Sequence, residues 1–214
     1  MDTLKKIIRR GISAFLMVPF LVALLCMAGS ASAVTYNLTA DVTSLTMPDG
    51  TLVSAWGFGI DGGPIQVPGA PLVVPVGDTN LTINLTNNLS EPVSLHILGQ
   101  VLTNNAGPVF TDGLTDTTLP GTERPTGNVT ARIRSFSHET AGGGGVGTYV
   151  WGSFKPGTFM LQNATNPAKQ VQMGLYAAVY QDTAAGEAYP GVTYDEQIIM
   201  VYHEIDPVIH QAVS

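Results

Sequence analysis

Few residues of this chain could do chemistry. The 214 residues include four histidines, His96, His138, His203 and His210, and a single cysteine, Cys26. Imidazole nitrogens and thiolates are the usual ligands of copper and zinc, but a firm site needs several of them to converge. His203 and His210 are separated by seven positions with a proline between them, which matches no ligand pattern that we recognise. We therefore expect no metal site at this pair.

The two remaining histidines have ordinary structural interpretations. His96 lies in a stretch of alternating apolar residues, 93–98, which is typical of a histidine within a β-sheet. His138 precedes the four glycines 142–145 and is predicted to be solvated or to hydrogen-bond within a turn. The glycines are predicted to form a flexible loop. They are no phosphate cradle, because no Lys-Ser/Thr pair or helix start follows them.

Hydrolytic chemistry has no anchor in the sequence. The chain contains neither a G-x-S-x-G elbow nor an H-E-x-x-H pair, the motifs that position a serine nucleophile or a catalytic zinc. The neighbouring carboxylates Asp195/Glu196 and Glu204/Asp206 are predicted to be solvated strand ends. No catalytic residue is therefore assigned.

The elements that position these residues begin after a secretory signal. A basic segment, residues 5–10, precedes an apolar run, 12–27, and the small residues 31–33 match a cleavage site. Residues 1–33 are therefore predicted to be a signal peptide that is removed, and the protein to be periplasmic or extracellular. An uncleaved anchor is disfavoured because the apolar run is short and contains a proline. A lipoprotein is disfavoured by the leucines before Cys26, and the export route, Sec or twin-arginine, stays open.

Cleavage would change the charge and the redox chemistry of the chain. Residues 34–214 hold five basic and 15 acidic residues, a net charge of −10, and no cysteine. So acidic a surface argues against nucleic acid and anionic membranes as partners. Without cysteine, neither a disulfide nor a thiolate ligand is available to the mature protein.

The pattern of the mature chain predicts one all-β domain. Residues 34–45 and 52–58 are predicted to form a hairpin around a turn at 47–50, and 72–76 and 80–87 a second strand pair. The segment from residue 103 to 130 is polar and reads as a long surface excursion. Further strands are predicted at 93–98, 130–136, 149–151, 158–162, 173–180 and 197–203. Because strands, turns and short loops alternate throughout, we predict a Greek-key β-sandwich of about seven to nine strands.

Four stretches, taken together, resemble a known family. They are residues 71–88, PLVVPVGDTNLTINLTNN; 91–99, EPVSLHILG; 156–179, PGTFMLQNATNPAKQVQMGLYAAV; and 194–210, YDEQIIMVYHEIDPVIH. In this order they resemble the first, plastocyanin-like cupredoxin domain of multicopper oxidases. After the predicted signal peptide at 1–33, the resemblance implies a cupredoxin domain at 34–193, and at 194–214 a strand that leads towards a second domain.

The resemblance also implies where copper ligands would be. In the family, two His-x-His pairs of this domain bind a trinuclear copper centre. The first pair falls on His96 and Leu98, and the second on Gln162 and Ala164. Only His96 is retained as a candidate metal ligand, and copper is the cofactor that it would bind.

Two functions from different classes follow. The first is a secreted cupredoxin domain without its own catalytic copper cluster, acting as a structural or interaction module. The alternative is the N-terminal part of a split or truncated copper-dependent oxidase, active only together with further cupredoxin domains or subunits. A third, weaker hypothesis makes His96 a lone copper site for metal handling.

Overall fold

The structure is a computed structural model that describes residues 32–111 and 131–213, and these form one compact unit. The predicted signal peptide lies outside the described residues, except that Ser32 and Ala33 already belong to the first strand. Among the described residues, no helix is long and apolar enough to cross a membrane.

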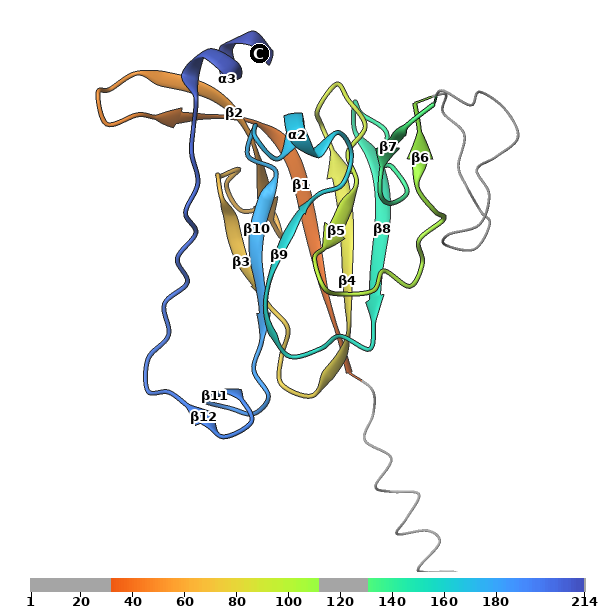
Figure 1. The fold of residues 1–214 in the computed structure, drawn as a ribbon, viewed down its shortest axis with the longest axis vertical. Coiled ribbons are helices and arrows are strands. Elements are labelled where there is room, and N and C mark those ends of the chain that lie inside the picture. Colours follow the sequence, from red (N-terminus) through yellow and green to blue (C-terminus); the bar gives the residue numbers. More distant parts are fainter. Residues whose placement is uncertain (1–31, 112–130, 214) are drawn as a thin grey trace, which may run out of the picture. The chain divides into compact units, whose positions relative to one another are not determined.

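Two four-stranded sheets face each other across the core (Figure 1). The first sheet has the order β2-β1-β4-β8, with β1 at Ser32–Thr46, β2 at Leu52–Ile60, β4 at Asp78–Asn87 and β8 at Gly145–Gly152. The second sheet has the order β3-β10-β9-β5, with β3 at Gly69–Val73, β10 at Tyr176–Gln181, β9 at Gly157–Asn163 and β5 at Leu95–Ile97. Both sheets are mixed, because β1 runs parallel to β4 and β3 runs parallel to β10.

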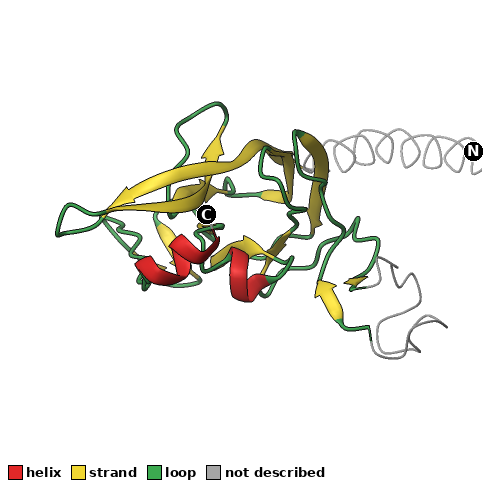
Figure 2. Ribbon diagram, turned by 90° about the horizontal axis from the view of Figure 1, so that it is seen from above, coloured by secondary structure: helices red, strands yellow, loops and turns green. Residues whose placement is uncertain are grey.

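Smaller elements lie outside the two sheets. Strand β6 at Val109–Phe110 pairs with β7 at Ile133–Ser135, and β11 at Glu187–Tyr189 pairs with β12 at Val192–Thr193. The helices among the described residues are α2 at Pro167–Gln170 and α3 at Pro207–Val213, and Figures 1 and 2 show both at the same end of the sandwich. The predicted excursion from residue 103 to 130 contains β6, and its residues 112–130 lie outside the described part.

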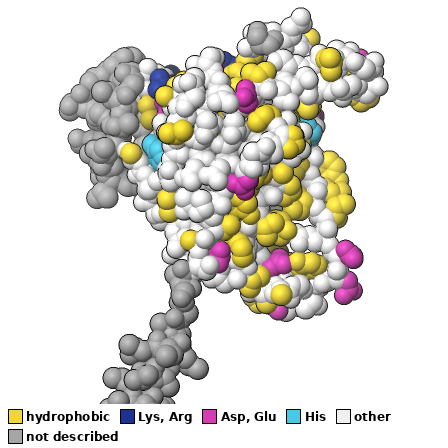
Figure 3. All heavy atoms as spheres, turned by 180° about the vertical axis from the view of Figure 1, so that it is seen from behind, with side chains coloured by type: hydrophobic (Ala, Val, Ile, Leu, Met, Phe, Trp, Pro, Cys, Tyr) yellow, Lys and Arg dark blue, Asp and Glu magenta, His cyan; other side chains and the backbone are white. Residues whose placement is uncertain are grey.

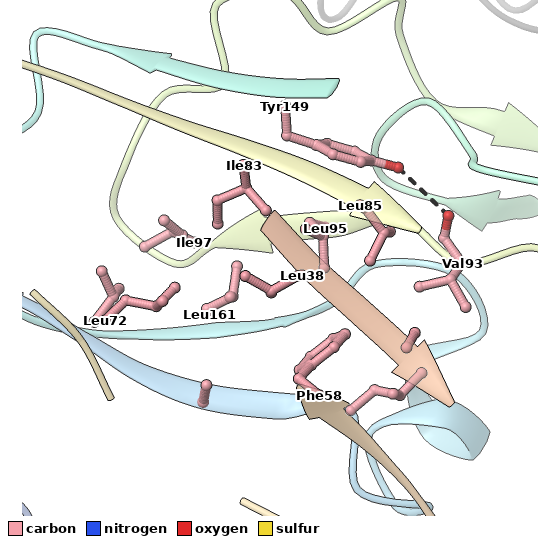
Figure 4. Close-up of a cluster of buried hydrophobic side chains, with 14 of the residues drawn as sticks. Leu38, Phe58, Leu72, Ile83, Leu85, Val93, Leu95, Ile97, Tyr149 and Leu161 are labelled. Carbon is pink, nitrogen blue, oxygen red and sulfur yellow. Dashed lines mark hydrogen bonds between the residues drawn. The ribbon is translucent and has the colours of Figure 1, made fainter. Parts of the chain in front are cut away.

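Alternating residues of β4 form part of the core. Leu81, Ile83 and Leu85 on β4 are at most 1% exposed, whereas the residues between them face outwards. Tyr149 and Trp151 of β8 and Leu161 of β9 join them from the two sheets. Figure 4 shows Ile83, Leu85, Tyr149 and Leu161 together with Phe58 and Leu72. The alternating residues of β4 therefore mark its inward face, because a period of two leaves one face of the strand for the core.

The predicted hairpin is confirmed, and the predicted second strand pair is wrong. Strands β1 and β2 pair antiparallel from Leu38↔Ile60 to Thr46↔Leu52. Strands β3 and β4, by contrast, lie in different sheets: β3 pairs with β10, and β4 pairs with β1 and β8. The connection carries the chain across the core, where Leu72 and Leu81 pack from opposite layers. Two apolar strands that follow each other in the sequence can bury their side chains in two ways. They can face each other from opposite sheets, or they can pair within one sheet.

The predicted strand 197–203 is also wrong. This segment is extended but has no neighbouring strand, and it runs from β12 to α3 along the second sheet (Figure 1). Local alternation is preserved: Ile198, Met200 and Tyr202 are exposed, while Ile199 and Val201 are half-buried. The sequence pattern specifies an extended backbone, but a strand also needs a partner to receive its hydrogen bonds.

Candidate functional site

Strand pairing in the second sheet brings two of the four predicted ligand positions together. His96 of β5 lies directly opposite Gln162 of β9 in the antiparallel register, and Gln162 lies opposite Tyr176 of β10. The residues that flank this row, Leu95 and Leu161 among them, belong to the core. His96, Gln162 and Tyr176 therefore form one row across the outer face of the second sheet, because successive side chains of a strand point to opposite faces.

His96 is half-buried beside an aromatic ring. Its imidazole stacks on Phe136, with ring centroids 6.0 Å apart and planes 6° from parallel. Its Nε2 atom is buried and has no hydrogen-bond partner among the described residues. Burial lowers the pKa of His96, since desolvation disfavours the charged form. The ring is therefore neutral at neutral pH, the protonation state that a metal ligand needs.

The other two predicted ligand positions do not join this row. Leu98 lies past the end of β5, 51% exposed, where its backbone N–H donates to the carbonyl of Met160. Ala164 is fully buried, and its backbone N–H donates to the carbonyl of Ser94. Position 164 thus belongs to the packed interior, while position 98 is open to solvent.

These residues do not fit a copper centre. Across the four positions the donor set is one imidazole, one amide and two alkyl groups, whereas copper prefers several nitrogen or sulfur donors. Within residues 32–111 and 131–213, no three His, Cys, Asp or Glu side chains are grouped so that they could hold a metal ion. We therefore derive no copper chemistry from this site.

A second histidine extends the row in a way that the sequence did not indicate. His203, on the extended C-terminal segment, hydrogen-bonds through Nδ1 to the phenol of Tyr176 and lies edge-on to its ring. The row thus reads His96, Gln162, Tyr176, His203. No spacing rule could have found this contact, because it depends on the C-terminal segment folding back over β10.

The remaining histidines are structural. His138 was predicted to be solvated or turn-bonding; instead its ring stacks on Tyr149 at 4.3 Å, and its Nε2 donates to the carbonyl of Thr148 on the edge strand β8. His210 of α3 is 1% exposed and donates from Nδ1 to the carbonyl of Ser54 on β2, at 2.7 Å. Each histidine thus fastens a neighbouring element to an edge of the first sheet.

The C-terminal segment creates the most unusual surface of the described chain. We call residues 195–206 the strap. It covers the outer face of β9 and β10, where Tyr176 and Ala178 are each only 7% exposed. Two hollows of about 480 and 370 Å³ lie between the strap and these strands, and a third of about 490 Å³ lies between the strap and the β11–β12 hairpin. Figure 3 shows hydrophobic side chains gathered on this face, with Asp and Glu side chains beside them.

Comparison with solved structures shows which proteins share this fold. The chain is similar to a multicopper oxidase from Pseudomonas thermotolerans, with 23% sequence identity and a TM-score of 0.51 over 71% of this chain and 30% of that one. A laccase from Botrytis aclada gives 23% identity and a TM-score of 0.48 over 73% of this chain and 24% of that one. A multicopper oxidase from Campylobacter jejuni, described as a metallo-oxidase, gives 17% identity and a TM-score of 0.47 over 73% and 27%. No family model and no curated protein matches the chain in sequence.

The comparison with the Pseudomonas enzyme confirms the fold class. The chain is a cupredoxin-like Greek-key β-sandwich, the fold that the four sequence stretches implied. It spans less than a third of the length of each of these three enzymes. At this level of identity the similarity concerns the fold alone, so function rests on the residues of the site.

Proposed function

We propose that this protein is a secreted, multicopper-oxidase-like cupredoxin domain that has no catalytic copper cluster of its own and acts as a structural or interaction module. The carrying observation is the donor set at the predicted ligand positions: His96 faces Gln162 across the β5–β9 pair, Leu98 lies in solvent, and Ala164 is buried. Oxygen reduction at copper needs imidazoles that converge on the metal. A scaffold that keeps the fold while carrying alkyl and amide groups at these positions supports binding rather than turnover.

Secretion is part of this proposal. It is supported by the basic and apolar residues at 5–27, by the small residues at 31–33, and by the acidic, cysteine-free composition of residues 34–214. A high negative charge keeps a secreted protein soluble and separate from anionic surfaces.

One observation favours the alternative, a part of a split or truncated copper-dependent oxidase. The chain corresponds to only 30% of the similar Pseudomonas multicopper oxidase, so further cupredoxin domains could be supplied by another polypeptide. Such a partner would also have to supply imidazoles in place of Leu98, Gln162 and Ala164. Reading the DNA beyond the codon of Ser214 tests this alternative, since a continuing frame or an adjacent cupredoxin gene would favour it.

The proposal itself is tested by copper analysis of the purified full chain. We expect less than one copper per chain after incubation with Cu(II) and dialysis, and no copper-dependent oxidation of a phenol or of a metal ion. Tight stoichiometric copper together with oxidase activity would overturn the proposal.

Two variants make this test specific. His96→Ala examines the lone-site hypothesis: if wild type and variant bind Cu(II) with equal affinity, His96 is no copper site. Gln162→His is the matched gain of ligand, because it places a second imidazole directly opposite His96 in the strand register. We expect this variant to bind Cu(II) at least about tenfold more tightly than wild type, since two converging imidazoles hold the ion better than one.

A further inference from the structure

The strap has the sequence of a strand without the hydrogen bonds of one. Among the described residues, no backbone N–H or C=O of residues 195–205 hydrogen-bonds to another backbone group. Within the described part of the chain, the one hydrogen bond to the backbone of residues 195–205 comes from the side chain of Gln172, which donates to the carbonyl of Glu204 at 3.5 Å. An extended segment with free backbone groups is a template for another strand.

The exposed side of the strap is apolar. Ile198, Met200 and Tyr202 alternate along it and are 81%, 62% and 85% exposed. Isoleucine and tyrosine are among the residues that strands favour, because they pack well against cross-strand neighbours. Three such side chains, aligned on one side of an unpaired extended backbone, give a partner strand both backbone and side-chain contacts.

The charges at the ends of the strap decide which partner fits. Asp195 and Glu196 precede the apolar stretch, Glu204 and Asp206 follow it, and all four are exposed. The ion pairs found among the described residues involve none of them.

A second copy of the chain is therefore a poor partner. Antiparallel self-pairing centred on Met200 would place Glu196 opposite Glu204, and like charges directly opposite each other destabilise a strand pair. The net charge of −10 of residues 34–214 adds further repulsion between copies.

We propose that residues 197–203 accept an extended segment of a different polypeptide as an added β-strand, and that this segment has alternating apolar residues in its centre and Lys or Arg at both ends. The basic ends pair with the two acidic ends of the strap, and the apolar centre covers Ile198, Met200 and Tyr202. The inference rests on the proposed role as an interaction module and names the chemistry of its partner.

The experiment uses synthetic peptides as probes. One peptide alternates valine and threonine over seven residues with two lysines at each end; its control is identical except that glutamates replace the lysines. Binding to the full chain is measured by titration at low and high salt, and amide hydrogen exchange is followed by NMR. A metal chelator is present throughout, so that the result is independent of copper.

We expect the lysine-flanked peptide to bind at least about tenfold more tightly than the glutamate-flanked one at low salt, and this ratio to shrink at high salt. Because the strap amides are free of backbone hydrogen bonds, exchange at residues 197–203 should slow at least about tenfold on binding. The double variant Ile198→Asp with Tyr202→Asp should lose binding. Its matched control, Leu52→Asp with Val146→Asp, alters exposed residues of the first sheet, 69% and 79% exposed, and should bind like wild type.

Three results would overturn the proposal: equal binding of the two peptides, slowed exchange only outside residues 197–203, or self-association of the chain that itself protects these amides. None of them depends on copper. If the chain binds stoichiometric copper and oxidises substrate, the proposed function fails whatever the peptides do; if only the peptides fail, the copper-free module stands without this partner.

Discussion

Replacing Tyr149 by phenylalanine tests how much a buried hydroxyl group contributes to the stability of the fold. The ring of Tyr149 is fully buried between His138 and Trp151, and phenylalanine retains this packing. The substitution removes only the hydroxyl, which donates to the carbonyl of His138 at 2.8 Å, lies 3.4 Å from the carbonyl of Val93 (Figure 4) and shares a hydrogen bond with Thr140 Oγ1 at 3.0 Å.

Three polar groups lose a partner in this variant, although the carbonyl of Val93 keeps its bond from the backbone N–H of Thr140. Leaving a buried donor or acceptor unpaired costs about 1–3 kcal/mol. Thr140 Oγ1 can rotate to find another acceptor, so we expect a total loss of about 2–3 kcal/mol in the free energy of unfolding. Since 1 kcal/mol shifts the melting temperature of a domain of this size by about 2–4 °C, the expected decrease is about 4–12 °C.

Urea unfolding followed by tryptophan fluorescence measures this loss. Trp56 and Trp151 are 6% and 1% exposed, so both report the exposure of the core. The matched control is Tyr202→Phe, which removes the same hydroxyl from a residue that is 85% exposed and should change stability by less than about 0.5 kcal/mol. If Tyr149→Phe unfolds within 0.5 kcal/mol of wild type, the reasoning about buried hydroxyl groups is refuted.

Three further predictions concern pH and the backbone. Burial raises the pKa of Tyr149 to about 12, so between about pH 10 and 12 the folded state keeps a proton that the unfolded state loses. The free energy of unfolding should therefore fall by up to about 1.4 kcal/mol per pH unit in this range. In denaturation series at different pH values, Tyr149→Phe should reduce this fall. Burial lowers the pKa of His96, so the free energy of unfolding should decrease as the pH falls below about 6.5, where the unfolded state takes up the proton first. His96→Phe should flatten this pH profile. Equal profiles of variant and wild type would contradict the assignment of the pH dependence to His96. Gly174 has φ +121°, and a Cβ there would lie 2.3 Å from the carbonyl oxygen of Trp56, so Gly174→Ala should destabilise the fold by about 2 kcal/mol or more. The control Gly50→Ala, at φ +87° with open space around it, should cost about 1 kcal/mol. Equal losses would show that the close approach of residue 174 to Trp56 is unimportant.

The histidines show how far the candidate site was readable from the sequence. The resemblance of the four stretches to a cupredoxin domain placed His96 and Gln162 at predicted ligand positions, and the strand register shows that these two residues lie opposite each other. The environment of each ring was not readable. The stack of His138 on Tyr149, the burial of His210 against Ser54 and the bond from His203 to Tyr176 all join residues from different elements.

The sequence by itself determined which side of an alternating strand such as β4 faces the core, because alternation with a period of two is a local property that the backbone geometry enforces. It also determined the two strands and the turn of the β1–β2 hairpin, and the missing imidazoles at positions 98, 162 and 164. Only the tertiary structure decided which strands pair. Residues 72–76 and 80–87 were expected side by side and lie in opposite sheets, while residues 197–203 were expected within a sheet and lie outside both. The physical reason is that side-chain burial is specified locally, whereas the partner of a backbone hydrogen bond is chosen among all the strands that the folded chain brings within reach.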